Sequence, residues 1–171
     1  LSRPAHRICV SPEVLSAVTP QANGSATFIP YGVPLEIFTA GEKKNEGSIL
    51  IWARKNPALG KNLQRELVAS GATVTLLLDY LAREDFAAAL RVSDIFVALP
   101  NPREGFFLPA LEGMASGCAV VCADAEGNRG FSIHGETCLM PKPDDLETHL
   151  ALTQQLLREP ALKEKIQRNG V

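Results

Sequence analysis

Residues 94–123, "DIFVALPNPREGFFLPALEGMASGCAVVCA", contain two short apolar runs separated by a polar loop and a helical pattern. The runs at 94–99 and 118–123 have the length and composition of buried strands. The helix between them is predicted near 108–116, because a proline at its start loses no hydrogen bond. A strand, a helix and a second strand of this kind predict neighbouring parallel strands that are covered on both faces.

The same alternation continues on both sides of this unit. Further strands are predicted at "SILIWA" (48–53), "TVTLLL" (73–78) and "TCLM" (137–140), with helices near 61–70, 83–92 and 144–157 and a last helix from Pro160. Near the N-terminus, "HRICV" and "ATFIP" are predicted strands around a helix at "PEVLSAV". The predicted fold class is α/β, a Rossmann-like doubly wound parallel sheet.

The composition is that of one globular domain. The chain has 171 residues, of which 46% are hydrophobic and 21% charged, and a formal net charge of -2. No strongly basic face is predicted, so we expect no nucleic-acid partner. The apolar runs are too short for a transmembrane segment, and the four cysteines lack zinc-ligand spacing, so we expect a soluble cytoplasmic protein without a metal. The chain begins at Leu1, and we expect it to be a piece of a longer protein.

A carboxylate in the helix near 108–116 is the most informative single residue. Glu112 stands in a helix that is otherwise apolar, and burying an unpartnered carboxylate costs several kcal/mol. It must become neutral, meet a cation or face a polar cavity. The functional interpretation is that Glu112 and Glu104 each accept hydrogen bonds from ligand hydroxyls, and the alternative is a buried ion pair or a bond to loop amides.

Three other groups of residues follow predicted strands, where ligands of such sheets bind. Backbone amides at the start of the helix could hold an anion: Gly105, Phe106, Phe107 and Leu108. Positive charge comes from Arg54, Lys55 and Lys61, which could neutralise a diphosphate or form an ordinary solvated loop. A third loop carries Gly127, Asn128 and Arg129, in which the glycine could allow close approach to a ligand or could belong to a plain turn.

The stretch "EGFFLPALEGMASGCAVV" (104–121) resembles the E-G-F-G-x-P-x-x-E-A-M-A-x-G-x-P-V-V signature of glycosyltransferase family 4, the group 1 retaining enzymes of GT-B fold. "FIPYGVPLEIF" is similar to the I-P-N-G-V-D linker of that family, and "HGETCLMPKPDDLETHL" to its D-G-x-T-G-L-L-V-P-P-x-D segment. The resemblance therefore covers nearly the whole chain. It implies the C-terminal, donor-binding half of a two-domain enzyme.

The resemblance also implies roles for matching residues. Glu104 resembles the catalytic-site glutamate that contacts the donor sugar, and Glu112 the glutamate that holds the ribose hydroxyls. The amides of residues 105–108 would face the sugar and phosphates, while Arg54 and Lys61 resemble the pair that holds the diphosphate. The implied substrate is a nucleotide-diphosphate sugar, with no obligatory metal, since no D-x-D follows a predicted strand.

The implied organisation is a remnant of the acceptor domain at residues 1–20, a linker at 21–47 and the donor-binding domain at 48–171. The family's N-terminal acceptor domain would be missing, so we expect the chain alone to be inactive as a hexosyltransferase of carbohydrate biosynthesis. Peripheral membrane association would come from that missing domain. The alternatives are a degenerate nucleotide-sugar-binding or scaffolding module and a GT-B-type nucleotide-sugar epimerase.

Two departures from the family pattern carry expectations. Phe107 stands where the family usually has glycine, which would place a ring near the donor pocket. The segment between Lys61 and Ser93 lacks one strand–helix unit that the family commonly has, so we expect the wall that contacts the base to be altered.

Overall fold

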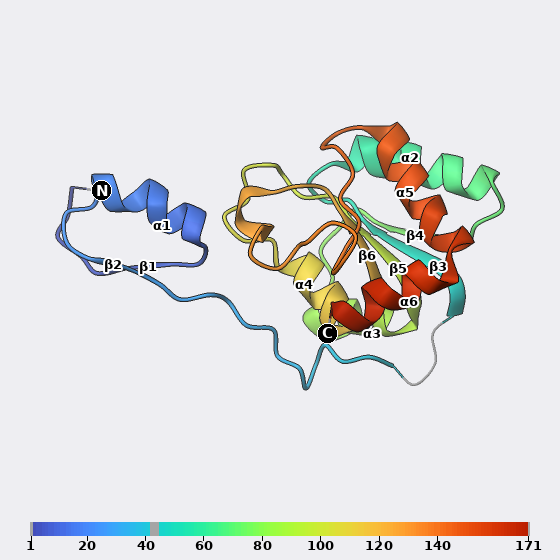
Figure 1. Cartoon of the computed structure of the whole chain (residues 1–171), viewed down its shortest axis with the longest axis horizontal. Coiled ribbons are helices and arrows are strands. Elements are labelled where there is room, and N and C mark those ends of the chain that lie inside the picture. The colour runs from blue at the N-terminus through green and yellow to red at the C-terminus, as the bar shows by residue number, and fades with distance from the viewer. Residues whose placement is uncertain (1, 42–44, 171) are drawn as a thin grey trace.

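The structure of the chain, a computed structural model, describes residues 2–41 and 45–170, and within them it contains two parallel sheets (Figure 1). The smaller sheet pairs β1 (Arg7–Cys9) with β2 (Ala26–Phe28), and α1 (Pro12–Val18) connects them. The larger sheet has the strand order β4-β3-β5-β6. Its elements are β3 (Asn45–Trp52), α2 (Pro57–Ala69), β4 (Val74–Leu77), α3 (Arg83–Val92), β5 (Ser93–Ala98), α4 (Leu108–Ala115), β6 (Ala119–Cys122), α5 (Leu146–Arg158) and α6 (Pro160–Asn169).

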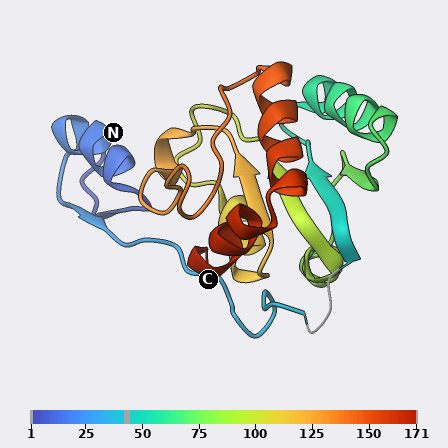
Figure 2. The ribbon, with the colours of Figure 1, turned by 45° about the vertical axis from the view of Figure 1, so that its right-hand side comes forward.

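Both faces of the larger sheet are covered by helices, which confirms the predicted α/β fold. Every residue of β5 and β6 is buried. Because successive strand residues point to opposite faces, Leu50 and Trp52 pack toward α3 and α4, whereas Ile49 and Ile51 pack toward α2, α5 and α6. Figure 2 shows α5 and α6 in front of the sheet. Uninterrupted apolar runs in the sequence therefore become strands with a hydrophobic core on each side.

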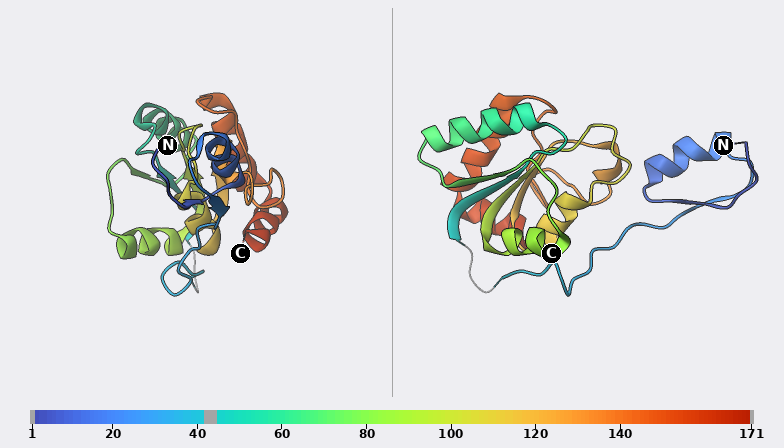
Figure 3. Two further views of the ribbon diagram at one scale, coloured as in Figure 1. Left: turned by 90° about the vertical axis from the view of Figure 1, so that its left-hand side faces the viewer. Right: turned by 180° about the vertical axis from the view of Figure 1, so that it is seen from behind.

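The N-terminal elements form a separate small unit, joined to the rest by an extended connector that begins at Pro30 (Figure 3). Phe38 anchors this connector, since its ring is fully buried and lies 6.3 Å from that of Phe86 in α3. The predicted boundaries at residues 20 and 47 stay predictions. Parts of the three predicted segments, residues 1, 42–44 and 171, lie outside the described residues.

Two predicted elements differ in the structure. "TCLM" was expected as a strand, but it makes only isolated bridges, Val121 with Leu139 and His134 with Cys138. A tight turn at Gly135, whose φ is 76°, precedes it. The backbone of Cys138 bonds within this turn, to Ile133 and Gly135, whereas that of Leu139 bonds to β6. The helix predicted near 61–70 begins earlier, at Pro57, because the side chain of Asn56 accepts a hydrogen bond from the amide of Leu59 and caps it.

No described helix has the length and apolar character that crossing a membrane requires.

Candidate functional site

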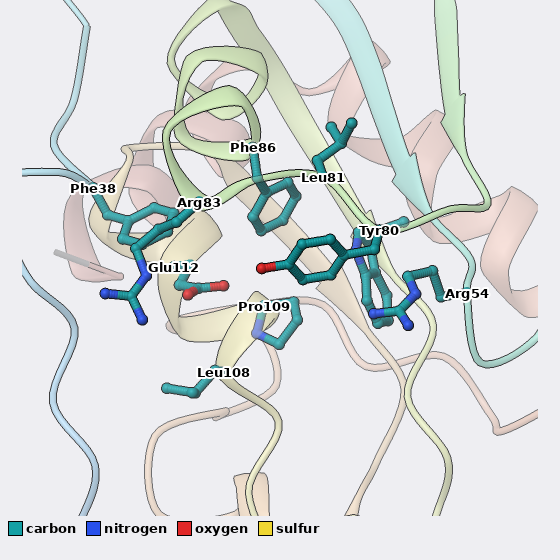
Figure 4. A pocket seen from close by; sticks show the side chains of 10 residues that line it. Phe38, Arg54, Tyr80, Leu81, Arg83, Phe86, Leu108, Pro109 and Glu112 are labelled. Carbon is teal, nitrogen blue, oxygen red and sulfur yellow. The ribbon is translucent and has the colours of Figure 1, made fainter.

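The loops at the carboxyl edge of the larger sheet surround a cavity of about 230 Å³ (Figure 4). Arg54 follows β3, Tyr80 lies in the loop after β4, and α4 begins after the loop that follows β5. Ligands of open α/β sheets bind at this edge. The cavity is lined by an aromatic and aliphatic set with three charged side chains: Phe38, Trp52, Tyr80, Leu81, Phe86, Leu108, Pro109, Arg54, Arg83 and Glu112.

Glu112 faces this cavity from the second turn of α4. Burial raises the pKa of its carboxyl group, and the nearby guanidinium of Arg83 lowers it by a smaller amount. Figure 4 shows the carboxylate pointing into the cavity, with the hydroxyl of Tyr80 directed toward it. No cation among the described residues forms an ion pair with Glu112. The alternative of a buried ion pair is therefore not what the structure shows, and the carboxylate is open to a ligand.

Arg54 supplies positive charge at another wall of the same cavity. Its guanidinium carbon lies 5.8 Å from the centroid of the Trp52 ring and 5.5 Å from that of the Tyr80 ring. Both distances fall within the range of cation–π contacts. Trp52 is almost fully buried, so its side of the contact is held by the core. A carboxylate and an oriented cation thus line one cavity.

Glu104 and Lys55 meet in the loop region next to the cavity. The ammonium nitrogen of Lys55 lies 3.0 Å from Oε1 of Glu104, and the side chains are 46% and 19% exposed. Glu104 is held further by its backbone, whose amide donates to the carbonyl of Asn101 and whose carbonyl accepts from Gly127. The structure therefore joins two residues that the sequence suggested for different roles.

The family profile described as "Glycosyl transferases group 1" matches residues 35–159, which include the cavity and both glutamates. The chain belongs to the group 1 glycosyltransferases. No curated protein sequence matches it.

Solved structures place this group 1 glycosyltransferase domain in the GT-B fold, as the C-terminal Rossmann-like domain. Sucrose-phosphate synthase from Thermosynechococcus elongatus superposes with a TM-score of 0.75 at 20% identity, covering 96% of this chain and 52% of that one. HepE of Anabaena, in complex with UDP and glucose, superposes with a TM-score of 0.72 at 15% identity, covering 95% of this chain and 56% of that one. The C-terminal domain of LpcC from Francisella tularensis superposes with a TM-score of 0.63 at 21% identity, covering 81% of this chain and 94% of that one. The chain thus spans about half the length of the first two.

In the group 1 glycosyltransferase domain, one amide of the predicted anion cradle is already occupied. The amide of Phe107 donates to Oδ1 of Asn128 at 3.0 Å, and Asn128 is only 1% exposed. The ring of Phe107 is buried against Trp52, with centroids 5.4 Å apart, so it contributes to the core and not to the cavity surface. Phe107 and Asn128 are therefore placed as structural residues, which corrects the expectation of a free amide at position 107. The Phe107 ring lies near the cavity, as expected, but behind Trp52. Leu108 lines the cavity, whereas Phe106 packs against Tyr31 and Phe131.

Gly127 permits a close approach, although to protein and not to a ligand. A Cβ atom at this position would overlap the carbonyl of Gly105. The amide of Gly127 donates to the carbonyl of Glu104 at 2.9 Å, which fastens the two loops together. Gly105 in turn faces α1, since a Cβ there would meet Val14. These glycines hold the loop of Glu104 in place.

Three predicted cations do not line the cavity: Lys61, Arg129 and Lys55, which pairs with Glu104. Lys61 is exposed on α2, and its proposed contact with a diphosphate stays a prediction. Arg129 forms a double hydrogen bond with Asp124, at 3.0 and 2.7 Å, and these bonds lower the pKa of the Asp124 carboxyl. The exposed position of this pair makes Arg129 a surface residue of the loop.

Sequence reasoning missed Tyr80 and Arg83. Tyr80 follows a strand at its carboxyl end, the same signal that singled out Arg54, so it could have been found. Arg83 opens α3, and only the packing of α3 beside α4 brings it toward Glu112, so no local pattern indicates it. Among the described residues, no group of three or more His, Cys, Asp or Glu side chains could hold a metal ion.

Proposed function

We propose that the chain is the donor-binding half of a retaining, family 4 glycosyltransferase, which transfers a sugar from a nucleotide-diphosphate sugar to an acceptor. Membership of the group 1 glycosyltransferases supports transfer of a sugar. The signature at residues 104–121 supports the family and the retaining outcome. The structure of HepE with UDP and glucose supports a nucleotide sugar as the donor. A hexose as the transferred sugar and a cytoplasmic location are parts of the same proposal.

The observation that carries the proposal is that Glu112 and Arg54 line the same cavity. A carboxylate accepts two hydrogen bonds from adjacent hydroxyls, as a ribose presents them. A guanidinium binds phosphate oxygens through several N–H groups at once. The cavity therefore has complementary groups for the two polar parts of a nucleoside diphosphate.

Glu104 has the catalytic-site role in this proposal. Its carboxylate accepts hydrogen bonds from hydroxyls of the transferred sugar, and the ion pair with Lys55 holds it in place. When the bond from the sugar to the diphosphate breaks, negative charge grows on the diphosphate. Arg54, with Lys61 as the second predicted cation, stabilises that charge, so the proposal needs no obligatory metal.

The acceptor would be positioned by a second domain. Transfer requires the attacking hydroxyl to be held against the donor, and fixed orientation contributes several kcal/mol toward lowering the barrier. The small unit of β1, α1 and β2 would then be the last part of that domain. We therefore expect this chain alone to bind the donor without transferring its sugar.

One observation favours the alternative of a binding or scaffolding module. The segment between Lys61 and Ser93 contains only the rest of α2, then β4 and α3. It is one strand–helix unit shorter than the family pattern that the sequence resembles. A shorter wall beside the cavity would be tolerated more readily in a protein that no longer catalyses transfer.

The test is calorimetric binding of UDP, ADP and GDP to the chain, followed by the Glu112→Gln variant. We expect at least one diphosphate to bind and the variant to weaken it by about 1–3 kcal/mol, the range for losing a charged hydrogen bond. Glu164→Gln, on the exposed surface of α6, is the matched control and should bind as the wild type does. Unchanged binding by Glu112→Gln would remove Glu112 from the site.

Release of nucleoside diphosphate separates the enzyme from the scaffold. Donors and acceptors would be supplied to this chain and to a complete two-domain protein containing it. Activity of the complete protein alone fits the proposal, and a complete protein that binds donor without turnover would favour the scaffold. Efficient transfer by the chain alone would contradict the requirement for a second domain.

A further inference from the structure

Tyr80 is a large aromatic residue that lies at the surface, just after the carboxyl end of β4. It is the most exposed large aromatic or aliphatic side chain among the described residues, at 74%. Isolated exposed apolar residues are common and need no explanation by themselves. Tyr80, however, lies in the loop after β4 at the margin of the cavity, and one face of its exposed ring lies against a charged group.

The charged group is Arg54, which lies near two rings. Trp52 is the last residue of β3 and pairs with Leu77 at the end of β4, so the loops that follow these strands leave the sheet side by side. This pairing brings the Tyr80 ring to 5.5 Å from the guanidinium carbon, with the Trp52 ring at 5.8 Å. The buried Trp52 is fixed, and Tyr80 supplies the outer contact.

The contacts with the rings leave the N–H groups of Arg54 available. Among the described residues, no carboxylate or carbonyl accepts a hydrogen bond from its guanidinium. A free arginine side chain samples many rotamers, and binding an anion then has to include the entropy lost on ordering it. An arginine already restrained by aromatic contacts loses less on binding. It also keeps the planar N–H edge that matches phosphate oxygens.

We propose that Tyr80 is a positioning residue that holds Arg54 against Trp52, so that the guanidinium is oriented for the diphosphate of the donor. The inference rests on the proposed function of the cavity as a nucleotide-sugar site. It assigns the ring of Tyr80, and not its hydroxyl, to this task. The hydroxyl points toward Glu112 on the other side of the cavity (Figure 4).

The test compares Tyr80→Leu with Tyr80→Phe by titration calorimetry. UDP, ADP and GDP are the probes, with uridine, adenosine and guanosine as the matching ligands without phosphate. Tyr80→Leu removes the ring and should weaken diphosphate binding roughly three- to tenfold, the range expected for a cation–π contact at an exposed or partly desolvated site. Binding of the nucleoside should stay nearly unchanged, and Tyr80→Phe should restore the diphosphate affinity.

A double-mutant cycle identifies Arg54 as the partner. In an Arg54→Ala background the Tyr80→Leu change should have no further effect on diphosphate binding, because the group it positions is absent. A loss that persists in that background would overturn the inference. So would equal losses for nucleoside and diphosphate, or a loss in Tyr80→Phe as large as in Tyr80→Leu, which would place the hydroxyl in direct contact with the ligand.

A magnetic-resonance measurement separates failure of this inference from failure of the proposed function. Ring currents of the two aromatic side chains should shift the side-chain resonances of Arg54, and Tyr80→Leu should reduce that shift while Tyr80→Phe keeps it. An unchanged shift in Tyr80→Leu would overturn the positioning role. Absence of binding by all three diphosphates to the wild-type chain would instead overturn the proposed function, whatever the resonances show.

Discussion

The ammonium group of Lys55 lies 3.0 Å from Oε1 of Glu104, so that loops following two different strands meet in one ion pair. Lys55 comes after β3 and Glu104 after β5, and these strands are direct neighbours in the sheet. The pair holds a partly buried carboxylate beside the cavity. A ligand hydroxyl that reaches Glu104 must therefore share it with Lys55.

This pair should contribute little to stability. Lys55 is nearly half exposed, so solvent screens the attraction, and Lys55→Met should lower the free energy of unfolding by at most about 1 kcal/mol. The effect should shrink in high salt. Urea unfolding measures it, with Lys61→Met as the control, since Lys61 is exposed and has no ion pair among the described residues. A loss well above that of an exposed pair would mean that Lys55 also orders the loop of Glu104.

Glu112 should make stability depend on pH in a defined direction. Burial raises its pKa above the ordinary value of 4.5, so the folded chain holds this proton more tightly than the unfolded chain. The resulting stabilisation is fully present below 4.5 and is lost as pH rises through the raised pKa. The side chain of the Glu112→Gln variant is uncharged at every pH. The free energy of unfolding of this variant, relative to that of the wild type, should therefore increase as the pH rises from 4.5 through the raised pKa, and then level off.

Urea unfolding at a series of pH values measures this difference. The exposed Glu164→Gln change should give a nearly flat difference over the same interval. A flat difference for Glu112→Gln as well would mean that the carboxylate remains solvated in the folded chain.

The cysteines should resist alkylation in the folded protein. All four are buried, and burial raises the pKa of Cys138 to about 11 and that of Cys122 further. Since the thiolate is the reactive form, iodoacetamide at pH 8 should label the native chain very slowly and the urea-unfolded chain quickly. Mass spectrometry over time checks this. Rapid labelling of Cys122 without unfolding would indicate that β6 opens locally.

Gly127 and Gly130 offer a matched pair of substitutions. A Cβ at Gly127 would overlap the backbone of Gly105, whereas a Cβ at Gly130 would meet nothing within 4 Å. Gly127→Ala should therefore destabilise the chain by about 1–3 kcal/mol, as overpacking does. Gly130→Ala should change stability by less than about 0.5 kcal/mol. Thermal unfolding measures the stability of both variants. Similar losses of stability would show that the loop of Gly127 separates easily from the loop of Gly105.

The fold was largely predictable because parallel strands buried on both faces leave a strong signal. Ile49 to Trp52 and Ile95 to Ala98 are apolar without alternation, and each of these runs lies in a strand. "TCLM" has a similar composition but lies beyond β6, where isolated bridges at Cys138 and Leu139 satisfy part of its backbone. Composition indicates burial there, and only the neighbouring turn decides how much ladder forms.

Site residues were predictable where they follow a strand in the sequence, and were not predictable where contacts between distant segments determine their position. Arg54, Leu108 and Glu112 were named from their positions, and all three line one cavity. Asn128 could not be assigned correctly, because its bond to the Phe107 amide joins residues 21 positions apart in sequence. Local patterns contain no information about such a contact.

The strand that leads to Tyr80 lies at the rim of the larger sheet. Within the described part of the chain β4 pairs with β3 alone, and it is four residues long, which suits an edge position. Arg54 and Glu112 depend on β3 and on α4 beside β5, which are central in the sheet. Evolution can therefore lengthen, shorten or replace the rim, and with it the aromatic contact on Arg54, without rebuilding the strands that carry both charged groups. Preference among donors can then diverge between relatives that share an unchanged central scaffold.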